Sequence, residues 1–167
     1  MTAKELQSLR NARSRRLGAA FEELIDRSCE YYKQQGIAMI EKTPEPMRTL
    51  RPLGNGRFEA VYTKQAQPDY KGTLYGGQCI VFDAKHTDTD RIKRSVVTEE
   101  QEKCLDTHEK MIAKCCVLVS FGFKKFYKFP WKLFRDMKYH FGVKYIRETD
   151  HIGDFEIKLI GDRLEFL

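Results

Sequence analysis

The sequence contains no apolar run that approaches the roughly 18 residues of a membrane-spanning helix. Its first residues, Met1 to Glu5, are mostly polar, so we expect no apolar signal region and a protein that stays in the cytoplasm. Internal repeats and low-complexity tracts are also absent. These features argue against a membrane protein and against a repeat array, and we expect no membrane partner.

Cysteine is too sparse and too irregularly spaced to indicate a zinc site or a small secreted scaffold. The 167 residues include five cysteines, an odd number, and none of them forms a Cys-x-x-Cys pair. We interpret all five as reduced core thiols. The adjacent Cys115 and Cys116 begin an apolar run, which favours small buried residues over a redox pair.

Helical and strand-like patterns alternate along a chain that is long enough to bury a core as one domain, residues 1–167. Apolar residues at three- and four-residue steps predict a helix from about Arg13 to Gln35, which Gly36 would end. A capping-box pattern at Thr98 to Gln101 predicts a second helix, from about Val97 to Lys114, with Met111 and Ile112 on its inner face. We expect strands at Ile37–Ile40, Arg57–Lys64, Cys79–Phe82, Cys115–Phe121, Phe123–Phe129 and within 152–160, and a short helix at Trp131–Met137. The alternation predicts a mixed α/β fold.

The strongest chemical signal is an acidic residue followed 14 positions later by Asp-x-Lys. Asp69 precedes a glycine-rich turn, and Asp83 and Lys85 end the apolar run that begins at Cys79. Alternate residues of a strand share a face, so Asp83 and Lys85 would project together, with Asp69 returning beside them. The alternative is a turn aspartate and a solvated strand end, since such a pattern is weak by itself. The order of the turn, strand and acids favours a metal-dependent nuclease.

Two neighbouring carboxylates repel each other unless a cation lies between them, and two or three oxygens plus water suit Mg²⁺. Such a metal would activate water and polarise a phosphoryl oxygen, while Lys85 would offset the negative charge of the transition state. Glu22 and Glu23 flank the apolar stripe of the first helix, and we consider Glu23 as a catalytic or metal-positioning residue, with plain solvation as the alternative. Gln101 has a competing role in the capping box.

Basic residues outnumber acidic ones by 30 to 24, and their clustering suits a polyanion such as DNA. A solvated charged face is the alternative for each cluster. The segment Met47–Gly56 is rich in turn residues, and Asn55-Gly56 is a hairpin signal, so we expect a basic loop or hairpin over residues 46–57. The clusters contain Arg10, Arg13, Arg15 and Arg16; Arg48, Arg51 and Arg57; and Lys124, Lys125, Lys128 and Lys132 among aromatic residues.

Several separate motifs resemble, in order, the RecU-type Holliday junction resolvases of Gram-positive bacteria and their phages, within the PD-(D/E)xK nuclease superfamily. The resemblance covers about residues 11–137. It is carried by Gly18–Asp26, Ile40–Pro44, Lys64-Gln65, Asp69-Tyr70-x-Gly72, Phe82–Lys85 with Thr87, Gln101 and Cys115–Phe121.

This resemblance implies a restriction-endonuclease-like core, in which helices flank a mixed central sheet and a basic stalk projects at 46–57. It further implies a homodimer that uses Mg²⁺, with Mn²⁺ as a substitute, and places paired nicks across four-way DNA junctions in recombination and repair. Asp69, Asp83 and Gln101 correspond to metal-binding residues, with Gln67 as a further ligand and Lys85 as the transition-state stabiliser. The expected DNA-binding residues are Arg13, Arg15, Arg16, Arg48, Arg51, Arg57 and Lys64.

The departures at the site include glutamate, which the family usually has at the position of Asp83, and threonine, which it commonly has at that of Gln67. The chain is also shorter than typical cellular members, which favours a phage origin and the bacterial host cytoplasm. We also consider a recombinase as a partner. The alternatives are a nuclease of the same superfamily that acts on flaps or duplex DNA, and a non-catalytic junction-binding protein that modulates a recombinase.

Overall fold

The computed structural model describes residues 2–44, 46–62 and 67–167, and its core is a seven-stranded sheet in the order β1-β4-β5-β7-β8-β10-β11. The strands are β1 (Ala38–Lys42), β2 (Met47–Gly54), β3 (Arg57–Tyr62), β4 (Tyr70–Leu74), β5 (Cys79–Thr87), β6 (Arg91–Lys93), β7 (Lys114–Phe121), β8 (Lys125–Pro130), β9 (Tyr145–Arg147), β10 (Glu156–Ile160) and β11 (Arg163–Glu165). The helices are α1 (Ala3–Gln34), α2 (Glu99–Lys110), α3 (Trp131–Arg135) and α4 (Met137–Phe141), with short 3₁₀ turns η1 (Arg94–Val96) and η2 (Gly153–Phe155).

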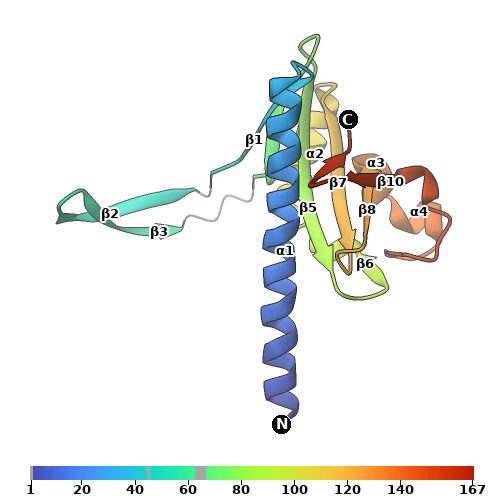
Figure 1. The fold of residues 1–167 in the computed structure, drawn as a ribbon, viewed down its shortest axis with the longest axis horizontal. Coiled ribbons are helices and arrows are strands. Elements are labelled where there is room, and N and C mark those ends of the chain that lie inside the picture. The colour runs from blue at the N-terminus through green and yellow to red at the C-terminus, as the bar shows by residue number, and fades with distance from the viewer. Residues whose placement is uncertain (1, 45, 63–66) are drawn as a thin grey trace.

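Helix α1 packs along one face of the sheet and begins ten residues before its predicted start. A capping box fixes its first turn, because the Thr2 hydroxyl accepts from the Glu5 backbone and the Glu5 side chain accepts from the Thr2 backbone. Phe21, Leu24 and Ile25 are buried against the sheet, whereas the N-terminal turns extend past it (Figure 1). Those turns cover no core, so they lack the apolar period from which the helix was predicted.

The centre of the sheet is buried on both faces. β5 and β7 run parallel, and their alternate residues divide between two hydrophobic clusters. Phe82 and Leu118 face α1, whereas Val81 and Val117 face the layer that contains Leu105 of α2. Helices therefore cover both faces, which confirms the mixed α/β prediction.

The glycine-rich segment after Asp69 was expected to be a turn, but it forms strand β4. Gly72 lies inside this strand, where an added Cβ would be 2.1 Å from the carbonyl oxygen of Met39 on β1. Its missing side chain permits close strand packing rather than a turn. Gly76 and Gly77 make the turn, both with positive φ. β5 then continues to Thr87, so Asp83 and Lys85 lie within the strand and not at its end as predicted.

The expected basic excursion is the antiparallel hairpin β2–β3, which spans residues 47–62 and is thus longer than predicted. Asn55 and Gly56 form its turn with positive φ, as their sequence indicates. Every residue of β2 is exposed. The hairpin leaves the sheet between β1 and β4 and projects away from α1 and the core (Figure 1).

Several smaller elements differ from the prediction. Helix α2 ends at Lys110, and the side chains of Met111 and Ile112 are exposed in the turn to β7 instead of facing the core. The predicted helix Trp131–Met137 breaks at Asp136 into α3 and α4. The pair β6–β9 was not predicted, because strands of three residues are too short to show a period. In the described part of the chain, every helix is too short or too polar to cross a bilayer.

Candidate active site

Strand register places Asp69 beside Asp83, although 13 residues separate them. Tyr70 of β4 pairs with Phe82 of β5, so the residues one step further along, Asp69 and Asp83, lie opposite each other. The Asp69 backbone N–H donates to Asp83 Oδ1 at 3.0 Å, and the Ala84 backbone N–H donates to Asp69 Oδ2 at 2.9 Å. Each carboxylate is thus held by the other's strand.

Lys85 completes a compact charged cluster. It lies two residues after Asp83 on the same face of β5, and its Nζ is 3.4 Å from Asp69 Oδ2 and 4.0 Å from Asp83 Oδ1. The Lys85 side chain is 17% exposed and that of Asp69 is 28% exposed, so both are accessible to solvent beside the buried Asp83. The structure therefore brings together Asp69, Asp83 and Lys85 in the arrangement expected from the sequence.

Asp83 is the buried member of this cluster, with no exposed side-chain surface. Burial is the main cause that raises its pKa, to about 6, and Asp69 adds to the shift while the Lys85 ammonium opposes it. Asp83 Oδ2 is buried and has no hydrogen-bond partner among the described residues. Such an oxygen is well suited to a cation, which would favour the ionised form.

The donor set fits a hydrated divalent ion. Among residues 2–44, 46–62 and 67–167, no three histidine, cysteine, aspartate or glutamate side chains form a metal-binding group. A cation here would be held by Asp69 and Asp83 together with water. Mg²⁺ is commonly bound in this way, by one or two carboxylates and retained waters.

Gln101 lies at the site, but its orientation differs from that of a ligand. Its Nε2 donates to Asp83 Oδ1 at 3.1 Å, and its Oε1 accepts from the Thr98 backbone at 3.2 Å within the capping box of α2. The oxygen that would bind a metal is therefore used by the helix cap. The geometry favours Gln101 as a residue that orients Asp83. Gln101 thus has both of the roles considered from the sequence, in the helix cap and at the site.

Two other predicted residues are not part of the cluster. Gln67 is exposed, and its Oε1 accepts from Lys71 Nζ at 2.9 Å. Glu23 is also exposed, whereas Glu22 lines a groove of about 520 Å³ together with Lys85. Glu22 also forms an ion pair with Lys42. Of the two glutamates, Glu22 is thus the one that borders a groove containing a residue of the cluster.

Glu22 lies on the side of α1 that faces β5. It lies one helical turn after Gly18, at which an added Cβ would be 4.0 Å from the Cβ of His86 on β5. Gly18 therefore lies on the side of α1 that contacts this strand. A glutamate four residues later therefore overlooks the same part of β5.

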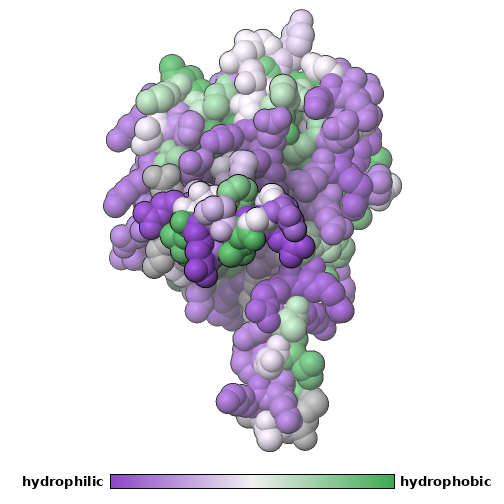
Figure 2. Space-filling model, turned by 90° about the vertical axis from the view of Figure 1, so that its left-hand side faces the viewer, coloured by the Kyte–Doolittle hydropathy of each residue, from purple (hydrophilic) through white to green (hydrophobic). Residues whose placement is uncertain are grey.

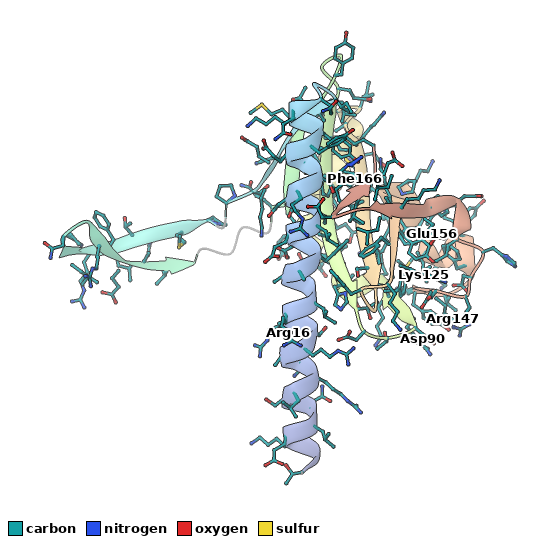
Figure 3. The ribbon with its side chains drawn as sticks, in the orientation of Figure 1. Arg16, Asp90, Lys125, Arg147, Glu156 and Phe166 are labelled. Atoms are coloured by element: carbon teal, nitrogen blue, oxygen red, sulfur yellow. The ribbon has the colours of Figure 1, made fainter. Side chains whose placement is uncertain are left out.

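The predicted DNA-binding residues fall on two exposed projections. Arg13, Arg15 and Arg16 lie on α1, and Arg15 lines the groove that contains Lys85. In Figure 3, Arg16 lies on the N-terminal half of α1, below the hairpin in that view. Arg48, Arg51 and Arg57 lie on the hairpin, where Arg51 forms an ion pair with Glu59 of the facing strand. Lys64 lies outside the described residues.

The third basic cluster, with its interleaved aromatic residues, is largely explained by the core. Phe126, Tyr127 and Phe129 of β8 are buried, as is Trp131. Lys128 lies between them and donates to the backbone oxygen of Phe166 at 2.7 Å. This segment was interpreted as a surface for a polyanion, but the aromatic side chains of β8 and that of Trp131 are buried and are not available to bases.

A family model described as "Recombination protein U" matches residues 16–158, most of the chain. The chain belongs to the RecU family. Curated relatives named "Holliday junction resolvase RecU" include those of Streptococcus pneumoniae (strain Hungary19A-6), 35% identical over 79 residues, and Geobacillus sp. (strain WCH70), 41% identical over 75 residues. A third, from Pediococcus pentosaceus, is 31% identical over 110 residues.

These alignments cover part of each RecU protein. They span 44%, 42% and 62% of this chain and 39%, 37% and 54% of the three relatives, in the same order. Among solved structures, a Holliday junction resolvase, Hjc, from Archaeoglobus fulgidus is similar with a TM-score of 0.39 and 13% identity, covering 65% of this chain and 76% of that one. The membership of the chain in the RecU family rests on the family model.

Proposed function

We propose that this RecU protein is a metal-dependent endonuclease that resolves four-way DNA junctions by paired nicks. The observation that carries the proposal is the pairing of Asp69 with a fully buried Asp83 beside Lys85. Mg²⁺ is the proposed cofactor, and Mn²⁺ should substitute for it because it also prefers oxygen ligands. DNA as substrate would place the activity in the bacterial cytoplasm, or in the host cytoplasm if a phage encodes the chain.

Each residue of the site has a distinct part in phosphodiester hydrolysis. Asp69 and Asp83 hold the cation, which when bound supplies polarisation of the phosphoryl oxygen and a more acidic water. Gln101 fixes the orientation of Asp83 through the 3.1 Å hydrogen bond. Lys85 presents a positive charge beside the scissile phosphate, where it offsets the charge that accumulates in the transition state. Glu22 overlooks the same groove and replaces Glu23 as the candidate from α1.

The hairpin β2–β3 is the proposed junction-binding element. Its root lies at the site, since Thr43 and Asp69, at the two ends of the excursion, are joined by a backbone hydrogen bond of 2.8 Å. In Figure 2 the hairpin points toward the viewer and shows hydrophilic and hydrophobic side chains together. A basic projection rooted beside the catalytic acids would link recognition of the junction centre with cleavage of a nearby strand.

A homodimer follows from the chemistry of paired nicks. The described residues bring together one Asp69–Asp83–Lys85 cluster, and two strands cut in one encounter need two clusters. The hairpin is a second reason to propose a homodimer. An isolated two-stranded hairpin is marginally stable, and this one has exposed apolar side chains that a second copy could cover. They are Met47, Leu50, Leu53, Phe58 and Val61.

The test is cleavage of a labelled mobile four-way junction and a matched linear duplex, each with Mg²⁺ and with EDTA. We expect metal-dependent, symmetric nicks in the junction alone. Asp83→Ala should lower the cleavage rate at least about 100-fold, as removal of a preorganised electrostatic group does, while junction binding persists. The matched control is Asp154→Ala, which removes an exposed carboxylate in η2.

The other outcomes point to the alternative functions. Cleavage of both DNAs would indicate a nuclease of flaps or duplex, and tight junction binding without cleavage would indicate a non-catalytic protein that modulates a recombinase. Full activity of Asp83→Ala would contradict the site proposed here.

A further inference from the structure

Thr43 extends the row of polar residues formed by Asp69 and Asp83. It follows β1 directly, and its backbone N–H donates to the carbonyl oxygen of Asp69 at 2.8 Å. Lys42 pairs with Tyr70, so the next residue, Thr43, lies opposite Asp69, just as Asp69 lies opposite Asp83. Three neighbouring strands thus contribute one residue each at the same level of the sheet.

The three side chains share a face. Directly opposed residues of antiparallel strands project to the same side, with Cβ atoms about 4.5–5.5 Å apart. Along β1, Ile40 packs in the cluster under α1 and Lys42 reaches Glu22 on that helix. Because successive side chains alternate, Thr43 turns to the opposite face, where Gln101 of α2 contacts Asp83.

The Thr43 hydroxyl oxygen is buried and has no hydrogen-bond partner among the described residues. In the described part of the chain this is true of two buried side-chain oxygen or nitrogen atoms, Thr43 Oγ1 and Asp83 Oδ2, and both belong to this row. Burying an unpaired hydroxyl is unfavourable, and valine has nearly the same shape without that cost. Two unpaired oxygens, one on each side of Asp69 in the same row, indicate that the row is built for a hydrated ligand that satisfies both.

We propose that the Thr43 hydroxyl is part of the cation site and binds a water of the cation's hydration shell. The inference rests on the proposed function, because it takes Asp69 and Asp83 to be the cation-binding carboxylates. Mg²⁺ keeps several of its waters in protein sites, and a hydroxyl both donates and accepts hydrogen bonds. Thr43 is therefore a positioning residue, which fixes the bound ion through its water and places the root of the hairpin against the ion.

The test measures Mn²⁺ binding to DNA-free protein by calorimetry and by the loss of the free-ion EPR signal. Thr43→Val keeps the shape and removes the hydroxyl, and we expect about tenfold weaker Mn²⁺ binding, the lower end of the effect of outer-shell partners. Thr43→Ser should restore the affinity to nearly that of the wild type. Thr73→Val is the matched control, since Thr73 lies on β4 four residues from Asp69 and is exposed.

A second readout separates this role from a structural one. In EDTA, Thr43→Val should unfold at the same temperature as the wild type or at a higher one, because an unpaired buried hydroxyl is lost. The inference is overturned if Thr43→Val binds Mn²⁺ as tightly as the wild type, or if Thr43→Ser binds as weakly as Thr43→Val.

The failure of the proposed function would look different. If the wild type binds no Mn²⁺, or if Asp83→Asn binds it unchanged, then the carboxylates do not form a cation site and both proposals fail. If Asp83→Asn loses binding and Thr43→Val does not, the cation site stands and the role of Thr43 alone is overturned.

Discussion

Asp83 is a carboxyl group that the fold buries completely, and this has a measurable cost in the metal-free protein. Burial raises its pKa from the ordinary 3.8 to about 6, so the folded protein holds this proton more tightly than the unfolded chain does. The contribution of the group to folded stability is therefore full below about pH 4 and is lost as the pH rises through about 6. At neutral pH, Asp83 destabilises the protein unless a cation compensates it.

Asp83→Asn should accordingly stabilise the metal-free protein above about pH 7, by up to about 3 kcal/mol, and leave its stability unchanged near pH 3.5. Both observed hydrogen bonds to Asp83 end on Oδ1, which asparagine retains. Urea unfolding in EDTA across this pH range measures the effect. Asp154→Asn serves as the control and should show no such pH-dependent gain. Lower stability of Asp83→Asn at neutral pH would contradict the burial argument.

At the scale of single elements, the hairpin β2–β3 is the feature whose function is easiest to isolate. Arg48 is exposed on β2, whereas Arg51 forms an ion pair with Glu59 across the hairpin. Arg48 forms no ion pair with a carboxylate among the described residues, so it has more to gain from a phosphate. Arg48→Ala should therefore weaken junction binding roughly five- to tenfold at about 0.1 M salt. It should also reduce the slope of the logarithm of the binding constant against the logarithm of the salt concentration by about one. Arg51→Ala should have a smaller effect on both.

The useful comparison is between DNA shapes. If the hairpin reads the junction, Arg48→Ala should leave linear duplex binding nearly unchanged, as measured by fluorescence anisotropy over a salt series. Lys158→Ala is the control, because it removes a positive charge from an exposed position on β10, near the opposite edge of the sheet. Equal losses on junction and duplex would show that Arg48 contributes only general attraction.

Elements with local signals could be predicted from the sequence, and those set by tertiary contacts could not. The hairpin turn at Asn55-Gly56 and the capping box of α2 each depend on a few adjacent residues, and both were predicted. Strand β4 was missed because Gly72 is there to let β1 approach, which no local pattern reveals. Glu22 and Glu23 are neighbours in the sequence, and only the packing of α1 on β5 decides which of them faces that strand.

The site shows the same limit. Spacing predicts that Asp83 and Lys85 share a face, and the structure adds the register that places Asp69 opposite Asp83. The roles of these residues in catalysis stay predictions. The cap that occupies the Gln101 oxygen, the contact of Gln67 with Lys71 and the unpaired Thr43 hydroxyl all depend on three-dimensional neighbours.

At the scale of the whole molecule, the number of catalytic sites in the assembly determines how many DNA strands are cut. One cluster of Asp69, Asp83 and Lys85 per chain means that a dimer has two, and that each should cut one strand of a junction. A heterodimer of one wild-type chain and one Asp83→Asn chain should then nick a single strand. A wild-type dimer should cut both strands before it dissociates.

A supercoiled plasmid that extrudes a cruciform distinguishes these products. Two cuts across the cruciform give linear plasmid, and one cut gives a nicked circle. We expect linear product from the wild type, nicked circles from a heterodimer purified through two different tags, and neither from the Asp83→Asn homodimer. A wild-type dimer that carries the same two tags controls for their effect. Linear product from the heterodimer at the wild-type rate would show that one site cuts both strands, and the two-site argument for a homodimer would then fail.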